Sequence, residues 1–475
     1  MADKIIFGTD GWRAIIADDF TFSNVRACTQ SIANYLNRAD LPAKSILIGY
    51  DTRFASEDFA ACAAEVMAGN GIKVYLCSTA SPTPVLSYGI TALKTTGGII
   101  ITASHNPAKW SGMKFKTSDG TSAPQETTDQ MEKEIPEILA AGAVRVSPIS
   151  QAVKSGAVEY VDLAPVYAGH IGKLVDLEAI KKARLKVAVD YMFGASAGSF
   201  SSFLGGGAIE LIEINNHRNP AFPGMAQPEP IAKNLAALRK AVVESKASVG
   251  IATDGDGDRL GVIDENGEFL TTLQVYALLA LYFLDALKKR GAIVKTLTST
   301  SMLDRLGELY SVPVLETPVG FKYIAPLMIS ENALIGGEES GGYGFRGHVP
   351  ERDGTLAGIY FLDFMVKTKK SPSELLKFLY DKVGPHHYIR SDVSFTPGER
   401  DKIINKVSSE HPLSIDGKKV EKTDTRDGFK FILSGGSWLL IRFSGTEPLL
   451  RIYSEAGSPG DAENLVAAGK KIAGV

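Results

Sequence analysis

The segment DGDGDR, residues 254–259, alternates three carboxylates with two glycines. The glycines allow a tight backbone path that turns Asp254, Asp256 and Asp258 in one direction. Clustered carboxylate oxygens are the hard ligands that suit Mg²⁺, Mn²⁺ or Ca²⁺. Arg259 adjoins them, in a position to hold a phosphate oxygen that the metal also contacts. The pattern therefore indicates a divalent metal site with a phosphate beside it.

Two other interpretations fit part of this segment. An EF-hand would place Glu265 at its twelfth position, but its sixth position is Arg259 instead of glycine, and an apolar strand precedes it in place of a helix. A solvated turn is the ordinary interpretation of a single DGD. Three spaced aspartates with an arginine, directly after an apolar strand, favour metal binding instead.

Ser104 stands in the segment TASHNP, residues 102–107, directly after an apolar run. Pro107 disfavours helix at Asn106, so the segment turns and displays the hydroxyl. A serine hydroxyl needs a base or a metal to act as a nucleophile, and the adjacent His105 does not by itself establish a dyad. The chain has no GxSxG elbow, which argues against an acyl hydrolase. On local sequence alone, a helix-capping serine is the simpler interpretation.

The segment GEESGG, residues 337–342, places short acceptors and donors on a glycine-rich backbone. Carboxylates such as that of Glu338 accept two hydroxyl hydrogen bonds, which suits a sugar, and Ser340 adds a further hydroxyl. The same composition is typical of a strand-to-helix connector. The segment therefore leaves both interpretations open.

The segment RFSGTEP, residues 442–448, is followed by Arg451. It combines cations, hydroxyls and an accessible backbone N–H, a composition that suits a phosphate. An ordinary hairpin turn has a similar composition. At the other end of the chain, FGTDGWR ends in Arg13 and is weak by itself. Lys114 lies ten residues after Ser104 and is either an acid or base in a cleft or, as the sequence alone favours, a surface lysine.

Short apolar strands alternate with helices in three stretches of the chain, which predicts mostly parallel sheets covered on both faces. The predicted strands cover residues 45–50, 72–77, 98–102, 186–190, 209–214, 248–253, 261–264, 293–297, 312–315 and 333–335. The predicted helices cover residues 56–70, 84–93 and 230–245. The last stretch has fewer helices and a strand pair at 438–443 and 450–454, which indicates an α+β unit.

A chain of 475 residues is too long for one core, and we expect four domains. Their predicted bounds are 1–150 with Ser104, 151–266 with the aspartates, 267–376 with GEESGG and 377–475 with RFSGTEP. In each α/β unit a strand runs directly into one of the polar segments. Because ligands of parallel sheets bind beyond the carboxyl ends of the strands, we expect these segments to converge on one cleft.

The composition favours a soluble, cytoplasmic protein. A net charge of −3 gives neither a nucleic-acid footprint nor a polybasic membrane signal, and no run of 18 apolar residues occurs. Cys28, Cys62 and Cys77 lie in apolar runs without a CxxC pair, as expected of buried thiols in a reducing compartment. We therefore expect small molecules as partners, with no nucleic acid and no membrane, and a monomer or a weak homo-oligomer.

Taken together and in this order, the segments resemble those of the α-D-phosphohexomutases, the phosphoglucomutase/phosphomannomutase family. TASHNP is similar to the family's phosphoserine loop, DGDGDR to its metal loop, GEESGG to its sugar-hydroxyl loop and RFSGTEP to its phosphate-binding loop. The resemblance runs from Gly8 to Arg451. It implies three similar α/β domains with mixed or parallel sheets and a C-terminal α+β domain, arranged around a central cleft.

The resemblance implies roles for individual residues. Ser104 would carry a phosphate and, with Asp254, Asp256 and Asp258, bind one Mg²⁺ per chain. Catalysis would involve Ser104, Arg13, Lys114 and His348. Substrate binding would involve Arg259, Lys322, Glu338, Ser340, Arg442, Ser444, Gly445, Thr446 and Arg451.

The implied reaction interconverts hexose 1-phosphate and hexose 6-phosphate, with a hexose 1,6-bisphosphate as intermediate and activator. GEESGG, residues 317–322 and the segment 347–354 around His348 are more similar to the glucose branch, which favours glucose phosphates, with mannose phosphates next. The FGTDGWR segment is similar to the glucosamine branch, so phosphoglucosamine mutase is the alternative. Gly342 departs from members that have a histidine there for proton transfer. A sugar-phosphate sensor without turnover is a hypothesis from another class.

Overall fold

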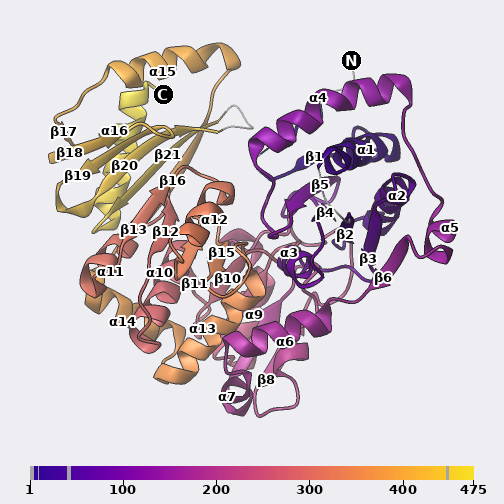
Figure 1. The fold of residues 1–475 in the computed structure, drawn as a ribbon. Coiled ribbons are helices and arrows are strands. Elements are labelled where there is room, and N and C mark those ends of the chain that lie inside the picture. The colour runs from indigo at the N-terminus through magenta and orange to yellow at the C-terminus, as the bar shows by residue number, and fades with distance from the viewer. Residues whose placement is uncertain (1–4, 9, 40–43, 445–448) are drawn as a thin grey trace.

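The computed structural model describes residues 5–8, 10–39, 44–444 and 449–475, which form four units, each built on one sheet (Figure 1). The first unit lies at the upper right of this view, the second at the bottom, the third at the left and the C-terminal unit at the upper left. The expected architecture of three α/β units and one α+β unit is confirmed. No helix in these ranges is long and apolar enough to cross a membrane.

The first sheet has the strand order β1-β5-β4-β2-β3-β6. Its strands are β1 (Trp12–Ile15), β2 (Ser45–Tyr50), β3 (Lys73–Cys77), β4 (Gly97–Ile101), β5 (Trp110–Thr117) and β6 (Val158–Val161). Its helices are α1 (Phe22–Arg38), α2 (Ser56–Gly69), α3 (Thr83–Ala92), α4 (Gln125–Ala141) and α5 (Ile149–Lys154). Because β6 pairs in parallel with β3, this sheet extends past residue 150, where the sequence placed the domain boundary.

The second sheet has the order β11-β10-β9-β7-β8. Its strands are β7 (Lys186–Asp190), β8 (Glu210–Ile214), β9 (Val249–Thr253), β10 (Leu260–Ile263) and β11 (Phe269–Leu270), with helices α6 (Ala164–Leu174), α7 (Leu177–Lys182), α8 (Ser199–Leu204) and α9 (Ala236–Ser245). The helix predicted over 230–245 starts late, after a 3-10 turn at Ala232–Asn234. There the side-chain amide of Asn234 donates to the carbonyl oxygens of Gln227 and Glu229 and closes a loop instead.

The third sheet has the order β13-β12-β14-β15, and the C-terminal sheet is antiparallel throughout with the order β16-β21-β20-β19-β18-β17. The third unit contains β12 (Ile293–Thr296), β13 (Val314–Thr317), β14 (Ile335–Gly337), β15 (Tyr343–Phe345), α10 (Thr272–Leu281), a π-helical turn (Tyr282–Ala286), α11 (Met302–Tyr310), α12 (Phe321–Ser330), α13 (Gly354–Thr368) and α14 (Pro372–Val383). The C-terminal unit contains β16 (His387–Ser394), β17 (Ser414–Ile415), β18 (Lys418–Asp424), β19 (Phe429–Leu433), β20 (Trp438–Phe443), β21 (Leu449–Ala456), α15 (Arg400–Ser409) and α16 (Pro459–Ala473).

Four of the polar segments singled out in the sequence, those of Ser104, the aspartates, GEESGG and RFSGTEP, each connect two antiparallel strands. The connections are β4 to β5, β9 to β10, β14 to β15 and β20 to β21. The first three add an antiparallel return strand to parallel strands, so these sheets are mixed, as the family resemblance allowed. The polar segments are therefore held at both ends by paired strands.

One cluster of buried apolar side chains runs through the first three units. It includes Leu86 of α3, Ile251 of β9 and Leu278 of α10. The C-terminal unit has a separate core that includes Ile441 and Ile452. The first three polar segments are thus set on a common apolar support, and the fourth on a support of its own.

Candidate active site

Ser104 follows β4 in a left-handed backbone conformation, with φ of 52°, and its side chain is buried. The hydroxyl of Thr102 accepts a hydrogen bond from the backbone N–H of Ser104 at 2.8 Å. The Oγ atom of Ser104 lies 3.4 Å from Oδ2 of Asp254, a residue 150 positions away. The helix-cap interpretation is wrong, because the segment leads into strand β5. The fold instead directs the serine hydroxyl at the aspartates.

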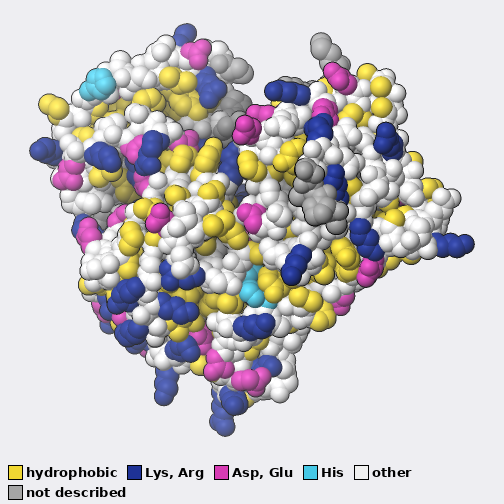
Figure 2. Space-filling view, viewed as in Figure 1, with side chains coloured by type: hydrophobic (Ala, Val, Ile, Leu, Met, Phe, Trp, Pro, Cys, Tyr) yellow, Lys and Arg dark blue, Asp and Glu magenta, His cyan; other side chains and the backbone are white. Residues whose placement is uncertain are grey.

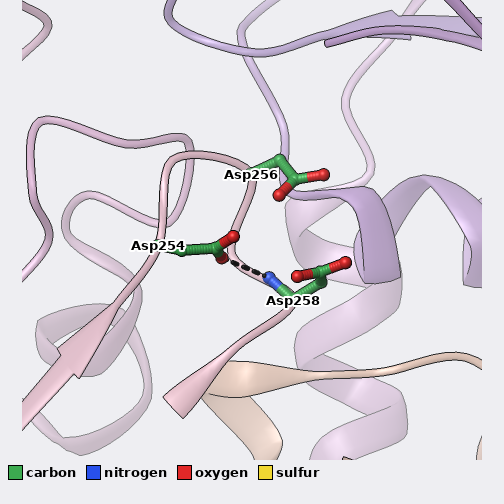
Figure 3. Close-up of side chains that lie close together, drawn as sticks. All are labelled: Asp254, Asp256 and Asp258. Carbon is green, nitrogen blue, oxygen red and sulfur yellow. Dashed lines mark hydrogen bonds between the residues drawn. The ribbon is translucent and has the colours of Figure 1, made fainter. Parts of the chain in front are cut away.

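Asp254, Asp256 and Asp258 are buried, and each offers an oxygen within 4.8 Å of the others (Figure 3). Oδ1 of Asp254 accepts the backbone N–H groups of Asp258 at 2.9 Å and of Arg259 at 3.2 Å, which holds the loop closed. Among the described residues, none forms a hydrogen bond with Oδ1 of Asp256. Burial contradicts a solvated turn, and the unsatisfied carboxylate oxygen fits a bound cation.

The three aspartates differ in their electrostatic surroundings. Burial and the charges of Asp258 and Asp256 raise the pKa of Asp254 well above its ordinary value. Burial acts in the same direction on Asp256, but Lys114 and the Thr83 hydroxyl hold the pKa of Asp256 below its ordinary value. Three carboxylates packed this closely repel one another in the folded chain. A divalent cation would remove that repulsion, so this donor set fits Mg²⁺.

Lys114 lies on β5, and its side chain is only 2% exposed. Its Nζ atom is 2.8 Å from Oδ2 of Asp10 and 3.0 Å from Oδ2 of Asp256. Burial alone would lower the pKa of Lys114, but Asp10 and Asp256 raise it above its ordinary value. The surface interpretation is therefore wrong. Lys114 is a buried, permanently charged cation next to the aspartates.

Arg352 is a site residue that the sequence reasoning missed, together with Asp10. Its Nη2 atom lies 2.9 Å from Oδ2 of Asp10 and 2.8 Å from Oδ2 of Asp258, and Nη1 lies 3.2 Å from Oε2 of Glu338. One guanidinium thereby joins the N-terminal segment, the metal loop and the GEESGG segment. Asp10 lies in FGTDGWR and Arg352 lies in the segment 347–354 around His348, but no role was predicted for either charge.

Arg13 and Arg259 lie beside this group. Nη1 of Arg13 donates to Oδ1 of Asn106 at 2.7 Å, which ties β1 to the Ser104 segment. Nη1 of Arg259 contacts Oε1 of Glu229 at 2.6 Å. Burial and these two arginines lower the pKa of His105 well below its ordinary value, so its imidazole is neutral. Nδ1 of His105 lies 3.3 Å from Oγ of Ser104.

The GEESGG segment joins two strands, so its interpretation as a strand-to-helix connector is wrong. Glu338 is nearly buried and hydrogen-bonded to Arg352, and Ser340 is half-buried in the same turn. Glu339 lies 3.4 Å from Nη1 of Arg390 on β16, which links this turn to the C-terminal unit. The segment therefore contacts the C-terminal unit through Glu339.

Lys322 lies at the start of α12, and its Nζ atom donates to Oε1 of Gln125 in the first unit at 3.1 Å. It lines a cavity of about 520 Å³ between α12 and the residues that connect β5 to α4. Within the described ranges its ammonium group contacts Gln125 and the ring of Tyr323, not the aspartates. The role in substrate binding predicted for Lys322 stays a prediction.

The predicted phosphate loop lies on the C-terminal unit, between β20 and β21. Nε of Arg442 donates to Oδ1 of Asp427 at 3.0 Å, and Arg451 is its cross-strand neighbour. The backbone N–H of Ser444 donates to the carbonyl oxygen of Leu449 at 2.8 Å. Gly445 and Thr446 lie outside the described residues. Figure 2 shows a hollow between this unit and the first unit.

His348 lies in a different environment. Its ring is fully buried, with Nε2 at 3.1 Å from Oδ2 of Asp353 and Nδ1 at 3.0 Å from Nε2 of His170. Tyr88 and Tyr167 pack against it. Because this ring is enclosed by other side chains, the placement does not support the catalytic role predicted for His348.

Models of four consecutive domains of one family match the chain. They are described as "Phosphoglucomutase/phosphomannomutase, alpha/beta/alpha domain I" at residues 4–141, domain II at 165–267, domain III at 273–383 and the C-terminal domain at 399–469. The four matches together cover most of the sequence.

Similar proteins span the whole chain. A phosphoglucomutase/phosphomannomutase of Thermococcus kodakarensis is 31% identical over 470 residues, 98% of either chain. A phosphoglucosamine/phosphogalactosamine mutase of Sulfurisphaera tokodaii is 31% identical over 474 residues, also 98% of either chain. The crystal structure of a protein from Thermus thermophilus, described as a "putative phosphomannomutase", superposes with a TM-score of 0.86 at 34% identity and covers 100% of both chains.

Proposed function

Because this chain belongs to the phosphoglucomutase/phosphomannomutase family and is therefore an enzyme, we propose that it interconverts hexose 1-phosphate and hexose 6-phosphate. Glucose phosphates are the favoured substrates and mannose phosphates the next. The observation that carries the proposal is the approach of Ser104 Oγ to Asp254 at 3.4 Å, with Lys114 on the adjacent Asp256. A hydroxyl, an oxygen-ligand site and a buried cation lie together there.

In the proposed reaction, phosphorylated Ser104 passes its phosphoryl group to the free hydroxyl of a hexose monophosphate. The bond from phosphorus to the serine oxygen breaks, and a bond to the sugar oxygen forms. The sugar hydroxyl loses its proton, and the serine oxygen gains one. The resulting hexose 1,6-bisphosphate turns round in the cleft and returns its other phosphoryl group to Ser104 by the reverse exchange.

The side chains of the site position these groups and balance their charge, which is the main task in phosphoryl transfer. Lys114 stays protonated and places a positive charge at Asp256. Arg13 holds Asn106, two residues after Ser104. His105 is neutral, and its Nδ1 atom lies 3.3 Å from the serine oxygen, where it can form a hydrogen bond that orients this oxygen. When bound by Asp254, Asp256, Asp258 and Ser104, Mg²⁺ would neutralise negative charge on the phosphoryl group.

The substrate would contact the third and fourth units. The carboxylate of Glu338 and the hydroxyl of Ser340 would accept and donate hydrogen bonds to sugar hydroxyls. Arg442, Ser444 and Arg451, with Gly445 and Thr446, would bind the phosphate that is not reacting. Arg259 would neutralise charge beside the aspartates. A phosphate anchor that is common to both orientations explains how one site serves both half-reactions.

A second candidate substrate is a glucosamine phosphate. The relative from Sulfurisphaera tokodaii, whose name is phosphoglucosamine/phosphogalactosamine mutase, is as similar to the chain as the phosphoglucomutase/phosphomannomutase relative is. Amino and hydroxyl groups at one sugar carbon differ in affinity by only a few kcal/mol, so small differences in the cleft decide between them.

The test compares turnover of glucose, mannose and glucosamine 1-phosphates side by side, with Mg²⁺ and a trace of the matching bisphosphate. We expect the largest kcat/KM for glucose 1-phosphate and a loss of about a thousandfold or more in kcat for Ser104→Ala, which retains the fold. A larger kcat/KM for glucosamine 1-phosphate would replace the favoured substrate. Binding without turnover of any of the three would favour the sensor, and normal turnover by Ser104→Ala would exclude the covalent route.

A further inference from the structure

Arg53 is fully buried beneath the Ser104 segment, at the end of β2. All four of its terminal N–H donors meet backbone carbonyl oxygens, three in that segment and one at Trp110, the first residue of β5. Nη2 donates to Ser104 and Asn106, each at 2.6 Å, and Nη1 donates to Pro107 at 3.0 Å and Trp110 at 2.9 Å. One side chain therefore binds three carbonyl groups of the turn that follows β4 and one at the start of β5.

The charge of Arg53 is balanced locally. Its Nε atom lies 3.1 Å from Oδ2 of Asp51, and Oδ1 of Asp51 accepts the backbone N–H of Arg53 at 2.9 Å. No aspartate of the metal loop forms an ion pair with it among the described residues. A buried arginine with one carboxylate partner and four carbonyl partners is a support for the backbone rather than a ligand for substrate.

The second unit closes over the same side chain. The ring of Phe222, itself buried, lies with its centroid 5.1 Å from the guanidinium carbon of Arg53. A side chain at Gly255 would place its Cβ only 2.7 Å from the carbonyl oxygen of Ser104, the same atom that Arg53 binds. The carbonyl that Arg53 holds is thus in close contact with the metal loop, and this contact requires glycine at 255.

We infer that Arg53 is the positioning residue of the phosphate-carrying segment, an inference that rests on the proposed function. Ser104 has a left-handed conformation that a residue other than glycine adopts only when its surroundings hold it. Arg53 fixes the carbonyl of Ser104 against Gly255, and this sets where Oγ lies relative to Asp254. The sugar and the second phosphate bind elsewhere, so Arg53 acts on the transfer step and not on substrate affinity.

The direct test is Arg53→Lys. An ammonium group keeps the charge but has no planar fork, so it cannot bind four carbonyl groups at once. A displacement of about 1 Å in a reacting group costs about a hundredfold in rate. We expect kcat to fall by about a hundredfold or more while KM for the hexose 1-phosphate changes by less than about threefold. Intact-mass measurement after incubation with hexose 1,6-bisphosphate should show slower phosphorylation of Ser104.

The matched control is Arg346→Lys. Arg346 also donates to backbone carbonyl groups, those of Arg290 at 3.0 Å and of Asn332, but in the third unit and away from the Ser104 segment. We expect its kcat to stay within about twofold of the unchanged protein. An equal fall of kcat in both variants would mean general weakening of the fold and would overturn the inference.

A second variant decides the question if Arg53→Lys does not fold. Phe222→Leu keeps the guanidinium and an apolar neighbour but removes the ring, and we expect a smaller fall in kcat, about tenfold, again with KM nearly unchanged. If Arg53→Lys folds and its kcat is unchanged, the inference is overturned. If Arg53→Lys does not fold, an unchanged kcat in Phe222→Leu overturns it. If the unchanged protein turns over no hexose phosphate at all, the proposed function fails instead, and the two failures are distinguished.

Discussion

At the scale of single residues, the site is a set of buried charges that share partners. Arg352 lies within 3.2 Å of carboxylate oxygens from Asp10, Asp258 and Glu338. Removing charges from water is costly, and their mutual attraction repays this only when every partner is present. The stability of this cluster therefore depends on the shared cation more than on any one carboxylate.

Replacing Arg352 with methionine should leave three nearly buried carboxylates without their common partner. We expect the free energy of unfolding to fall by about 3–5 kcal/mol, measured from urea-induced unfolding in the absence of added metal. The control is Arg239→Met, because Arg239 forms an exposed pair with Glu268 at 3.4 Å and should lose less than about 1 kcal/mol. Equal losses in the two variants would contradict the cluster as described.

The sequence predicted which residues carry the chemistry better than it predicted their partners. Asp254, Asp256 and Asp258 are recognisable because like charges at regular spacing with glycine are unusual. Lys114 is not, because a lysine on a strand is ordinarily exposed, and its burial depends on Asp10, which is more than a hundred residues away. Such long-range pairing leaves no local pattern in the sequence.

At the scale of elements, the site is assembled from hairpin connections and from one helix end. Helix α3 of the first unit begins at Thr83, which contacts Asp256. The backbone N–H of Thr83 donates to the carbonyl oxygen of Asp256 at 2.8 Å, and its hydroxyl donates to Oδ2 of Asp256 at 2.7 Å. The positive end of the helix also favours a carboxylate at this position. The first unit thus orients a residue of the second.

Thr83→Val keeps the shape of the side chain and removes its hydroxyl. Because a hydrogen bond to a buried carboxylate is lost, we expect the free energy of unfolding to fall by about 1.5–3 kcal/mol, seen as a lower urea midpoint. Thr83→Ser retains the hydroxyl and should lose clearly less. If the serine variant is destabilised as much as the valine variant, the hydroxyl is not what holds Asp256.

The strands that lead into the polar segments were predictable, and those that return from them were less so. Strand β4 is a fully buried apolar run, whereas β5 contains Lys114 and Lys116, whose buried charges are balanced by distant carboxylates such as Asp10, Asp256 and Glu351. Strand β15 has three residues, too few for a pattern to emerge. Short or charged strands depend on tertiary contacts, and single-sequence patterns do not contain these.

At the scale of the whole molecule, polar contacts join the second and third units in addition to the apolar core that they share. Nε2 of His170 on α6 lies 3.0 Å from Nδ1 of His348, and Tyr167 on the same helix donates to Asp353. Asp353 in turn caps α13 by accepting the N–H of Leu356 at 2.8 Å. The backbone N–H of Gly354 donates to the carbonyl oxygen of Gly257 in the metal loop at 3.0 Å. The pair of His170 and His348 therefore lies at the joint between the second and third units, next to the residues that contact the metal loop.

This joint makes stability depend on pH. Burial, with smaller contributions from the neighbouring His348 and Lys173, lowers the pKa of His170 to about 4, against about 6.5 in an unfolded chain. Between these values the unfolded chain binds more protons than the folded one, so the stabilisation is complete above pH 6.5 and is lost as the pH falls towards 4. We expect His170→Gln to lose about 1 kcal/mol less stability than the unchanged protein as the pH falls from about 6.5 to about 4. This figure is reduced because water screens a half-buried ring.

The measurement is the urea midpoint at several pH values between 4.5 and 7.5, a window that contains the transition expected from about pH 6.5 downwards. The control is His411→Gln, because His411 is exposed and should leave the slope of stability against pH unchanged. Parallel slopes for His170→Gln and the unchanged protein would show that His170 binds the same number of protons in the folded and unfolded states, which would contradict the prediction. A flatter slope of stability against pH in His170→Gln, but not in His411→Gln, would show that protonation of His170 destabilises the folded protein.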